Sequence, residues 1–326
     1  GLVVATSLAA CSNDGGNSLV VYAGRNENLI RPLLERFAKD TGVDITVRYG
    51  ETAELLPTIL EEGKNTRADV FIAQDAGALG RLSHAGFLVR LPQGQLDVVE
   101  PRFREPKGTW LALTARVRVI AYNTARVPED ELPQSVFELT QPKWKDRIGF
   151  PPTNASFTAF VSALTEEVGV PKVRTWLEGL KANGAKTFDN NVQVVKAISA
   201  GEVDLGLVNH YYLYSELKED DRANVANHYP GQNADGEGTF INISGIGIMQ
   251  RSEQKEAAER LVSFLLSEES QRFFRDETAE YPVRKGVGAR SELPALSSLK
   301  TINVPLSNLG GDLAKTQALL KEVGLT

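Results

Sequence analysis

WLALTARVRVIAY, from Trp110 to Tyr122, is the stretch that decides the fold. Its apolar and β-branched residues predict a strand, but the run is longer than an ordinary strand in one compact sheet. A strand of this length can run from one domain into the next. TFINISGIGIM, from Thr239 to Met249, is a second long run of the same kind. Together they predict two lobes that are joined by crossing strands and separated by a cleft.

The N-terminal part of the chain indicates the architecture of the lobes. The apolar runs Ser18 to Ala23 and Ala68 to Ala73 predict buried strands, and the alternating run Val43 to Tyr49 predicts a strand between them. Apolar residues at helical spacing predict helices over 29–41 and 53–62. This βαβαβ order predicts an α/β fold with a parallel sheet and right-handed crossovers.

The order of the predicted elements also indicates which parts of the chain form each lobe. We expect a discontinuous N-terminal lobe of residues 19–115 and 243–288. Residues 116–242 and 289–326 would form the C-terminal lobe. Residues 1–18 would precede both lobes.

Composition narrows the class of protein. The chain has 326 residues, of which 42% are apolar and 24% charged, as in soluble globular proteins. Its net charge of −6 argues against a nucleic-acid partner, because a phosphate-binding surface needs a basic excess. One Cys and three His exclude a disulfide framework and a Cys-rich zinc site.

The first residues predict export. GLVVATSLAA, from Gly1 to Ala10, is apolar and rich in small residues, so we expect the sequence to begin inside a secretory signal peptide. Leu8 to Cys11 resembles the lipobox of bacterial lipoproteins, in which the Cys becomes the lipidated N-terminus. Ser12 to Ser18 would then be a short tether. The alternative is a generic signal peptide in which Cys11 is incidental.

LVNHYYLY, from Leu207 to Tyr214, contains the most unusual side chains. It follows an apolar run from Val203 that predicts a strand, and it precedes a predicted helix start at Ser215. Ligands of open α/β sheets bind outside the carboxyl ends of strands. Adjacent strand residues point to opposite faces, so Tyr211 and Tyr212 converge only if the strand has already ended. The pair is either two half-buried aromatics or a phenolate pair that binds a strongly electropositive ion.

Four segments of the sequence resemble those of bacterial periplasmic ferric-ion-binding proteins, the solute receptors of ABC-type iron importers. They are SLVVYAGRNENLIRPLLERFAKDTGVDITVRYGETAELLPTILEEG, ADVFIAQDAGALGRL, KWKDRIGFPPTNASF and GEVDLGLVNHYYLY, in this order. The resemblance covers nearly the whole chain from about Ser18. It implies the two-lobed periplasmic-binding-protein fold of type II, with the ligand cleft between lobes joined by two crossing β-strands.

In that family the tyrosine pair supplies two phenolates to Fe(III), which implies metal ligation by Tyr211 and Tyr212 here. The chemistry agrees, because ferric ion is hard and highly charged and prefers oxygen anions to thiolates. A free phenol has a pKa near 10. A bound cation reverses the usual pKa logic and deprotonates its ligand.

The sequence departs from the family at other ligand positions. Asn26 stands where many members have a His, and Gln74, followed by Asp75, stands where many have an acid. Asn154 stands where some members have a third tyrosine. Asn26, Gln74 and Asp75 are candidates to complete the metal shell. With only two anionic ligands, the ion would need a synergistic anion such as carbonate, phosphate or citrate.

The resemblance and the helix pattern together suggest an anion pocket. Arg25 and Arg116 match arginines that face the cleft in the family, and guanidinium groups bind oxyanions bidentately. Asn191 and Asn209 match residues that hydrogen-bond the anion. The remaining candidates lie at a predicted helix N-terminus, where N–H groups favour negative charge: Asn154, Ala155 and Ser156.

Each of these candidates has a structural alternative. The arginines could form ion pairs with other side chains, and Asn154, Ser156 and Asn191 could cap helices. His210 is expected to lie behind the tyrosine pair and not to bind the metal.

The sequence thus predicts an exported receptor and not an enzyme. It would be a monomer, periplasmic or anchored to the outer face of the cytoplasmic membrane, that captures Fe(III) with an anion and delivers it to an ABC permease and its ATPase. The alternative is a receptor of the same fold for an organic anion or a metal chelate. A hydrolase is disfavoured, because the sequence has neither a G-x-S-x-G nor an H-E-x-x-H motif.

Overall fold

The computed structural model describes residues 18–232 and 238–326. Cys11 and the predicted signal segment lie outside these residues. Every helix in the described part of the chain is too short or too polar to cross a membrane.

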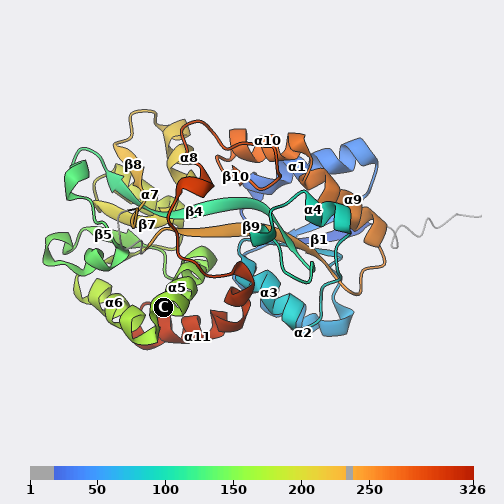
Figure 1. The fold of residues 1–326 in the computed structure, drawn as a ribbon, viewed down its shortest axis with the longest axis horizontal. Helices are drawn as coiled ribbons and strands as arrows, with labels where there is room; N and C mark the ends of the chain where they lie inside the picture. Colours follow the sequence, from blue (N-terminus) through green and yellow to red (C-terminus); the bar gives the residue numbers. More distant parts are fainter. Residues whose placement is uncertain (1–17, 233–237) are drawn as a thin grey trace, which may run out of the picture.

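The described residues form one mixed sheet with helices packed around it (Figure 1). Its strand order is β2-β1-β3-β9-β4-β7-β5-β6, with β8 and β10 also paired to β4. The strands are β1 Leu19–Gly24, β2 Ile45–Tyr49, β3 Val70–Ala73, β4 Leu111–Asn123, β5 Ile148–Phe150, β6 Lys186–Thr187, β7 Leu205–Asn209, β8 Val225–His228, β9 Phe240–Ile248 and β10 Tyr281–Pro282. The helices are α1 Glu27–Thr41, α2 Thr52–Glu62, α3 Ala76–His84, α4 Gln93–Asp97, α5 Ala155–Val168, α6 Val170–Ala182, α7 Asn191–Ser199, α8 Tyr211–Glu219, α9 Lys255–Leu265, α10 Glu268–Glu277 and α11 Leu309–Val323.

The predicted N-terminal βαβαβ unit is present. β1 pairs in parallel with both β2 and β3. Helix α1 buries Ile30, Leu33, Leu34 and Phe37, whose spacing places them on one face. The helix ends at Gly42, whose φ of 67° is in the left-handed region that favours glycine.

The two long strands lie side by side at the centre of the sheet, as their sequences predict. β4 and β9 pair antiparallel from Leu111–Ile246 to Arg118–Phe240. One end of β4 also pairs with β10, and the other end pairs with β7 and β8. In Figure 1 the two strands therefore run across the middle of the molecule, between two groups of helices. All thirteen residues of β4 are buried, so its polar side chains lie inside the protein.

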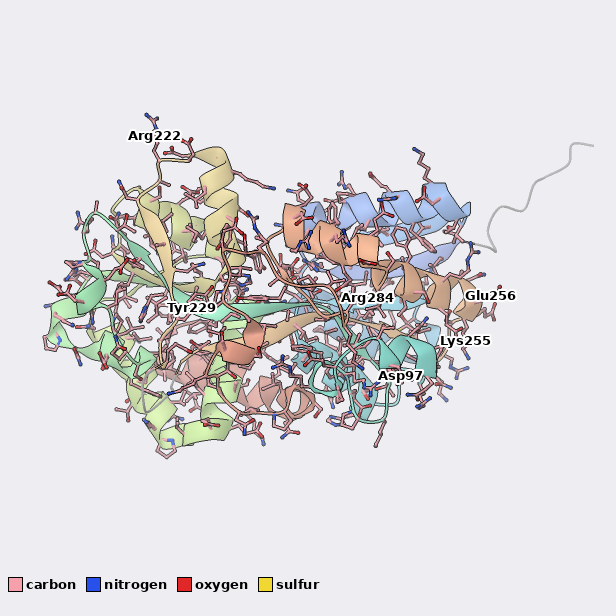
Figure 2. The ribbon with its side chains drawn as sticks, turned by 45° about the horizontal axis from the view of Figure 1, so that its top comes forward. Asp97, Arg222, Tyr229, Lys255, Glu256 and Arg284 are labelled. Carbon is pink, nitrogen blue, oxygen red and sulfur yellow. The ribbon has the colours of Figure 1, made fainter. Side chains whose placement is uncertain are left out.

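The molecule is elongated along these strands. Arg222, after α8, lies near one end, and Lys255 and Glu256, at the start of α9, lie at the other (Figure 2). Helix α11 packs against α3 as well as α5 and α6. It therefore contacts elements of both predicted lobes, and the boundary after residue 288 remains a prediction.

Three short elements differ from the sequence prediction. Neither β8 nor β10 was predicted. Both strands pair with β4, so they depend on a distant part of the chain. Helix α8 begins at Tyr211 and not at Ser215.

Gly245 of β9 occupies a position with no room for a side chain. A Cβ there would lie 2.8 Å from the backbone oxygen of Leu111 and 2.6 Å from Cδ1 of Leu79. Gly245→Ala should therefore lower the free energy of unfolding by about 1–3 kcal/mol, the usual cost of overpacking a core. Urea unfolding of the ligand-free protein measures this.

Gly94→Ala is the matched control. Gly94 lies in α4, and a Cβ there would meet no atom within 4 Å. The change should leave stability unaltered or raise it by up to about 1 kcal/mol, because alanine favours helix. Equal effects of the two substitutions would contradict the close contact between β9 and β4.

Candidate functional site

The tyrosine pair lies on the first turn of a helix. β7 ends at Asn209, and His210 already has helical angles, with φ −53° and ψ −35°. This immediate turn explains why α8 begins four residues before the predicted start. Successive helix residues are about 100° apart, so Tyr211 and Tyr212 diverge less than neighbours on a strand would. Their ring centroids are 4.3 Å apart.

The two tyrosines differ in exposure, since Tyr211 is buried and Tyr212 is half-buried. Tyr211 is 1% exposed, and its hydroxyl lies 3.2 Å from Nε2 of Gln74, which follows β3. Burial raises the pKa of Tyr212 well above its ordinary value, and the neighbouring Tyr211 phenol raises it further, while Arg116 opposes the shift. Tyr212 is therefore a neutral phenol unless a cation binds.

His210 is engaged on both sides of its ring. Its Nδ1 accepts a hydrogen bond from the Val117 N–H at 3.1 Å, and its Nε2 donates to the Ala279 carbonyl at 2.8 Å. Burial lowers the pKa of His210 to about 4, so the ring is neutral. Neither nitrogen is free to bind a metal in this structure.

Arg25 forms an ion pair, which was the structural alternative for this residue. Its Nη2 lies 2.6 Å from Oε2 of Glu280, and its Nη1 donates to Ser244 at 3.0 Å. Both charged side chains are fully buried. Burial acts to raise the pKa of Glu280, but Arg25 and a hydrogen bond from Thr114 outweigh it, so this pKa lies below its ordinary value. Only Nε of this guanidinium lacks a partner, and the role of Arg25 at an anion stays a prediction.

Arg116, on β4, has more unpartnered guanidinium nitrogens than Arg25. It is fully buried, and its Nη2 donates to Oγ of Ser156 at 3.2 Å. Nε and Nη1 have no hydrogen-bond partner. Burial lowers the pKa of Arg116, and the opposing charges nearby, Tyr211 foremost, reduce that effect.

Arg118 is a site residue that the sequence prediction missed. Its Nη1 donates to Oδ1 of Asn191 at 3.1 Å and to Oδ1 of Asn209 at 3.4 Å. Nη2 donates to the Leu207 carbonyl, and Nε has no partner. Burial lowers the pKa of Arg118 to about 9. The alternation of a strand could have revealed it, because Arg116 and Arg118 point to the same face of β4.

The asparagines divide into helix caps and site residues. Asn190, and not Asn191, caps α7. Asn191 and Asn209 are buried, and the Oδ1 of each accepts a hydrogen bond from Arg118. The Nδ2 of each has no partner. Asn154 caps α5 by accepting from the Ser156 N–H at 3.1 Å.

At the N-terminus of α5, Asn154 Oδ1 accepts from the Ser156 N–H, and Ser156 Oγ accepts from Arg116. Their role at an anion stays a prediction. Ala155 is half-buried on the first turn.

The other candidate metal ligands are helix caps or hydrogen-bonding partners. Asn26 is exposed and caps α1 through the Asn28 N–H at 3.0 Å. Asp75 caps α3 through the Ala78 N–H at 2.9 Å, and burial raises its pKa. Gln74 bonds Tyr211. Residues 18–232 and 238–326 contain no group of three or more His, Cys, Asp or Glu that could hold a metal.

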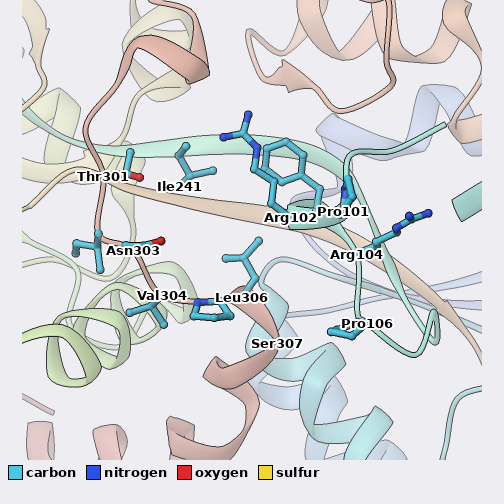
Figure 3. Close-up of a pocket in the computed structure, with 13 residues that line it drawn as sticks. Pro101, Arg102, Arg104, Pro106, Ile241, Thr301, Asn303, Val304, Leu306 and Ser307 are labelled. Atoms are coloured by element: carbon cyan, nitrogen blue, oxygen red, sulfur yellow. The ribbon is translucent and has the colours of Figure 1, made fainter. Parts of the chain in front are cut away.

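A separate cavity of about 360 Å³ lies between residues 101–106 and 301–307, beside Ile241 of β9 (Figure 3). None of the predicted site residues lines it. None of its lining residues has a buried polar side-chain atom without a partner. It is therefore distinct from the tyrosine site.

The two-lobed fold, with an oxygen-donor pair and buried arginines beside its crossing strands, defines a solute receptor. The chain belongs to the bacterial extracellular solute-binding protein family, whose model matches residues 65–306. The predicted fold class and the family resemblance are both confirmed.

Individual relatives agree with this assignment. The chain is 33% identical to the Fe(3+)-binding periplasmic protein of Serratia marcescens over 99% of this chain and 95% of that protein. Iron-bound HitA from Pseudomonas aeruginosa has a TM-score of 0.89 and 35% identity, over 95% of this chain and 100% of that one. A Trichodesmium protein (IdiA, FutA) in complex with iron and citrate has a TM-score of 0.79 and 32% identity, again over 95% and 100%.

The Arg25–Glu280 pair permits a direct test of the buried charges. Glu280→Gln should lower the free energy of unfolding by about 3–5 kcal/mol, because it leaves Arg25 buried without a counter-charge. Chemical denaturation of the ligand-free protein measures the change.

Glu322→Gln is its control, since Glu322 pairs with Arg174 at 2.7 Å on the surface. Exposed pairs contribute about 0–1 kcal/mol. A loss below about 1 kcal/mol for Glu280→Gln would show that the buried pair contributes no more to stability than an exposed pair does.

Proposed function

We propose that this protein is an extracytoplasmic receptor that captures Fe(III) together with an anion and delivers the ion to an ABC permease. One observation carries the proposal. Two adjacent phenols lie among buried hydrogen-bond donors that have no acceptor.

The phenols account for the cation. Burial keeps Tyr212 neutral in the empty protein, so the site favours an ion whose charge is high enough to remove the phenolic protons. Fe(III) is such an ion and prefers oxygen anions. In the described part of the chain no cluster of carboxylates, histidines or cysteines competes as a metal site.

The unpartnered donors account for the anion. They are Arg116 Nε and Nη1, Arg118 Nε, Asn191 Nδ2 and Asn209 Nδ2. Buried polar groups in native proteins are nearly always hydrogen-bonded, so these donors fit a group that accepts. The unpartnered acceptors among the predicted site residues, Gln74 Oε1 and Asp75 Oδ2, follow β3 on the other side of Tyr211. Two phenolates leave one positive charge on Fe(III), and the two arginines add to it. Carbonate, phosphate or citrate would supply the missing negative charge and oxygen ligands.

The remaining parts of the proposal concern place and partners. Cys11 would carry a lipid that holds the receptor at the membrane surface, and the ATPase of the importer would power transfer from the docked receptor. The lobes would comprise residues 19–115 with 243–288, and 116–242 with 289–326. We propose binding and delivery of the ion without catalysis.

A receptor for an organic anion alone is the second candidate, because the same donors would bind a carboxylate or phosphate without a metal. The two functions differ in one observation. An iron receptor mixed with ferric salt and bicarbonate should develop a visible tyrosinate-to-iron charge-transfer band. A colourless protein whose thermal stability rises with an organic anion would support the second function.

Tyr211→Phe and Tyr212→Phe should each abolish the charge-transfer band, because each removes one phenolate. The visible spectrum after addition of ferric salt and bicarbonate measures this, and circular dichroism checks that the fold is intact.

Tyr214→Phe is the control on the same helix. Tyr214 is half-buried and lies against Arg290, with the guanidinium carbon 5.0 Å from the ring centroid. Its substitution should leave the band unchanged. An undiminished band in either Tyr211→Phe or Tyr212→Phe would refute the ligand assignment.

Arg116→Gln should weaken binding of the anion about tenfold or more, since hydrogen bonds to charged groups contribute about 1.5–3 kcal/mol. The midpoint of band formation during titration with bicarbonate or citrate measures the affinity. Arg102→Gln is the control, because Arg102 is exposed and pairs with Glu100 at 2.9 Å. Equal midpoints in all three proteins would remove Arg116 from the anion site.

A further inference from the structure

Tyr211 is shut off from solvent in this structure, whereas Tyr212 is half-buried. Tyr211 is 1% exposed and contacts Gln74, which belongs to the other predicted lobe. An ion can reach this phenol only if the two lobes separate. The contacts that join α8 to the opposite lobe therefore govern the entry and release of cargo.

In the described part of the chain, two residues of α8 and its cap besides Tyr211 donate side-chain hydrogen bonds to the opposite predicted lobe. Lys218 donates to the Glu277 carbonyl at 2.9 Å, but this contact is exposed, so water can replace it. The other is the hydrogen bond from His210 Nε2 to the Ala279 carbonyl, which is buried and touches no predicted ligand atom of the anion site. We call this hydrogen bond the closing contact.

The segment that receives the closing contact is held firmly. Ala279 is buried with a φ of 57°, a left-handed conformation that a non-glycine residue adopts only where its surroundings impose it. The next residue, Glu280, is bonded to Arg25 and Thr114. Tyr281 then pairs with β4. The Ala279 carbonyl is therefore a fixed acceptor.

The ring of His210 connects this acceptor to the metal-binding phenol. Its centroid lies 5.0 Å from that of Tyr281 and 5.7 Å from that of Tyr211, and the His210 and Tyr211 rings are nearly perpendicular, at 89°. On its other side Nδ1 accepts from Val117, which lies in the same predicted lobe as His210. Of the two ring hydrogen bonds of His210, only the Nε2 bond crosses between the predicted lobes.

We propose that His210 is a positioning residue that holds the cleft closed through its Nε2 bond to Ala279, and that this bond sets how fast bound cargo leaves. The inference rests on the proposed function for its cargo. Opening would break the bond, so the closed form gains a stabilisation that does not depend on the ion.

Two substitutions separate the two hydrogen bonds of His210. Gln can place an amide N–H near the position of Nε2 and so keep the closing contact, while it loses the acceptor for Val117. Asn can place its Oδ1 near the position of Nδ1 and so keep the Val117 bond, while it loses the closing contact. His210→Asn should release iron about tenfold faster than wild type, and His210→Gln should stay within about twofold, since tenfold corresponds to about 1.4 kcal/mol.

The release rate is measured as the decay of the charge-transfer band after addition of excess chelator. Thermal unfolding of the ligand-free proteins is measured alongside, because a purely structural role would lower the stability of both variants and leave their release rates equal. Equal release rates for the two variants, or a wild-type rate for His210→Asn, would overturn the proposal.

A second measurement needs no iron, so the proposal can fail or succeed apart from the function. Spin labels at Arg222→Cys and Lys255→Cys, in a Cys11→Ser background, report the end-to-end distance of the ligand-free protein. These positions are exposed and lie near opposite ends of the molecule (Figure 2). His210→Asn should shift the distance distribution away from that of wild type, and His210→Gln should not. Identical distributions for all three would refute the closing role, whereas a wild type that forms no band would refute only the iron cargo.

Discussion

Two positive charges buried on alternate residues of one strand are the constraint on which the site depends. Arg116 and Arg118 lie on the same face of β4, at the centre of the sheet and away from water. A buried charge is costly unless it is paired and hydrogen-bonded. The protein satisfies these guanidinium groups only in part, with amide, hydroxyl and carbonyl oxygens, and no carboxylate pairs with either of them in the described structure. A bound anion would compensate the positive charge that remains on the two guanidinium groups.

The contrast with Arg25 makes the division of roles clear. Arg25 is equally buried, but Glu280 neutralises it, and Ser244 occupies another of its N–H groups. Among the described residues, one buried arginine thus has its charge compensated within the protein, and two do not. Only the uncompensated arginines, Arg116 and Arg118, favour binding of an anion. Both lie on β4, which pairs with the strand that precedes the tyrosine pair.

The sequence predicts those features that depend on local pattern. Strand alternation and helical spacing give the βαβαβ unit and the two long strands, and the NHYY motif gives the tyrosine pair. It does not predict the partner of Arg25, which is 255 residues away, or that of Arg118 at Asn191, which is 73 residues away. Family resemblance places Arg25 and Ser156 in the cleft, but it does not show the neighbours that bond their polar atoms, which are Glu280 and Ser244 for Arg25 and Arg116 for Ser156. The start of α8 was missed because His210 is fixed by Val117 and Ala279, and not by a capping side chain of its own.

The position of the tyrosines on the first turn of α8 has an electrostatic consequence. The N-terminus of a helix carries a partial positive charge from its unsatisfied N–H groups, and this favours negative charge on nearby side chains. Helical side chains also tilt toward the N-terminus, so both phenol oxygens lie on the favourable side. The same eight-residue stretch therefore provides the ligands, their mutual orientation and part of the field that stabilises their charged form. A tyrosine pair on a strand would have only the first of these.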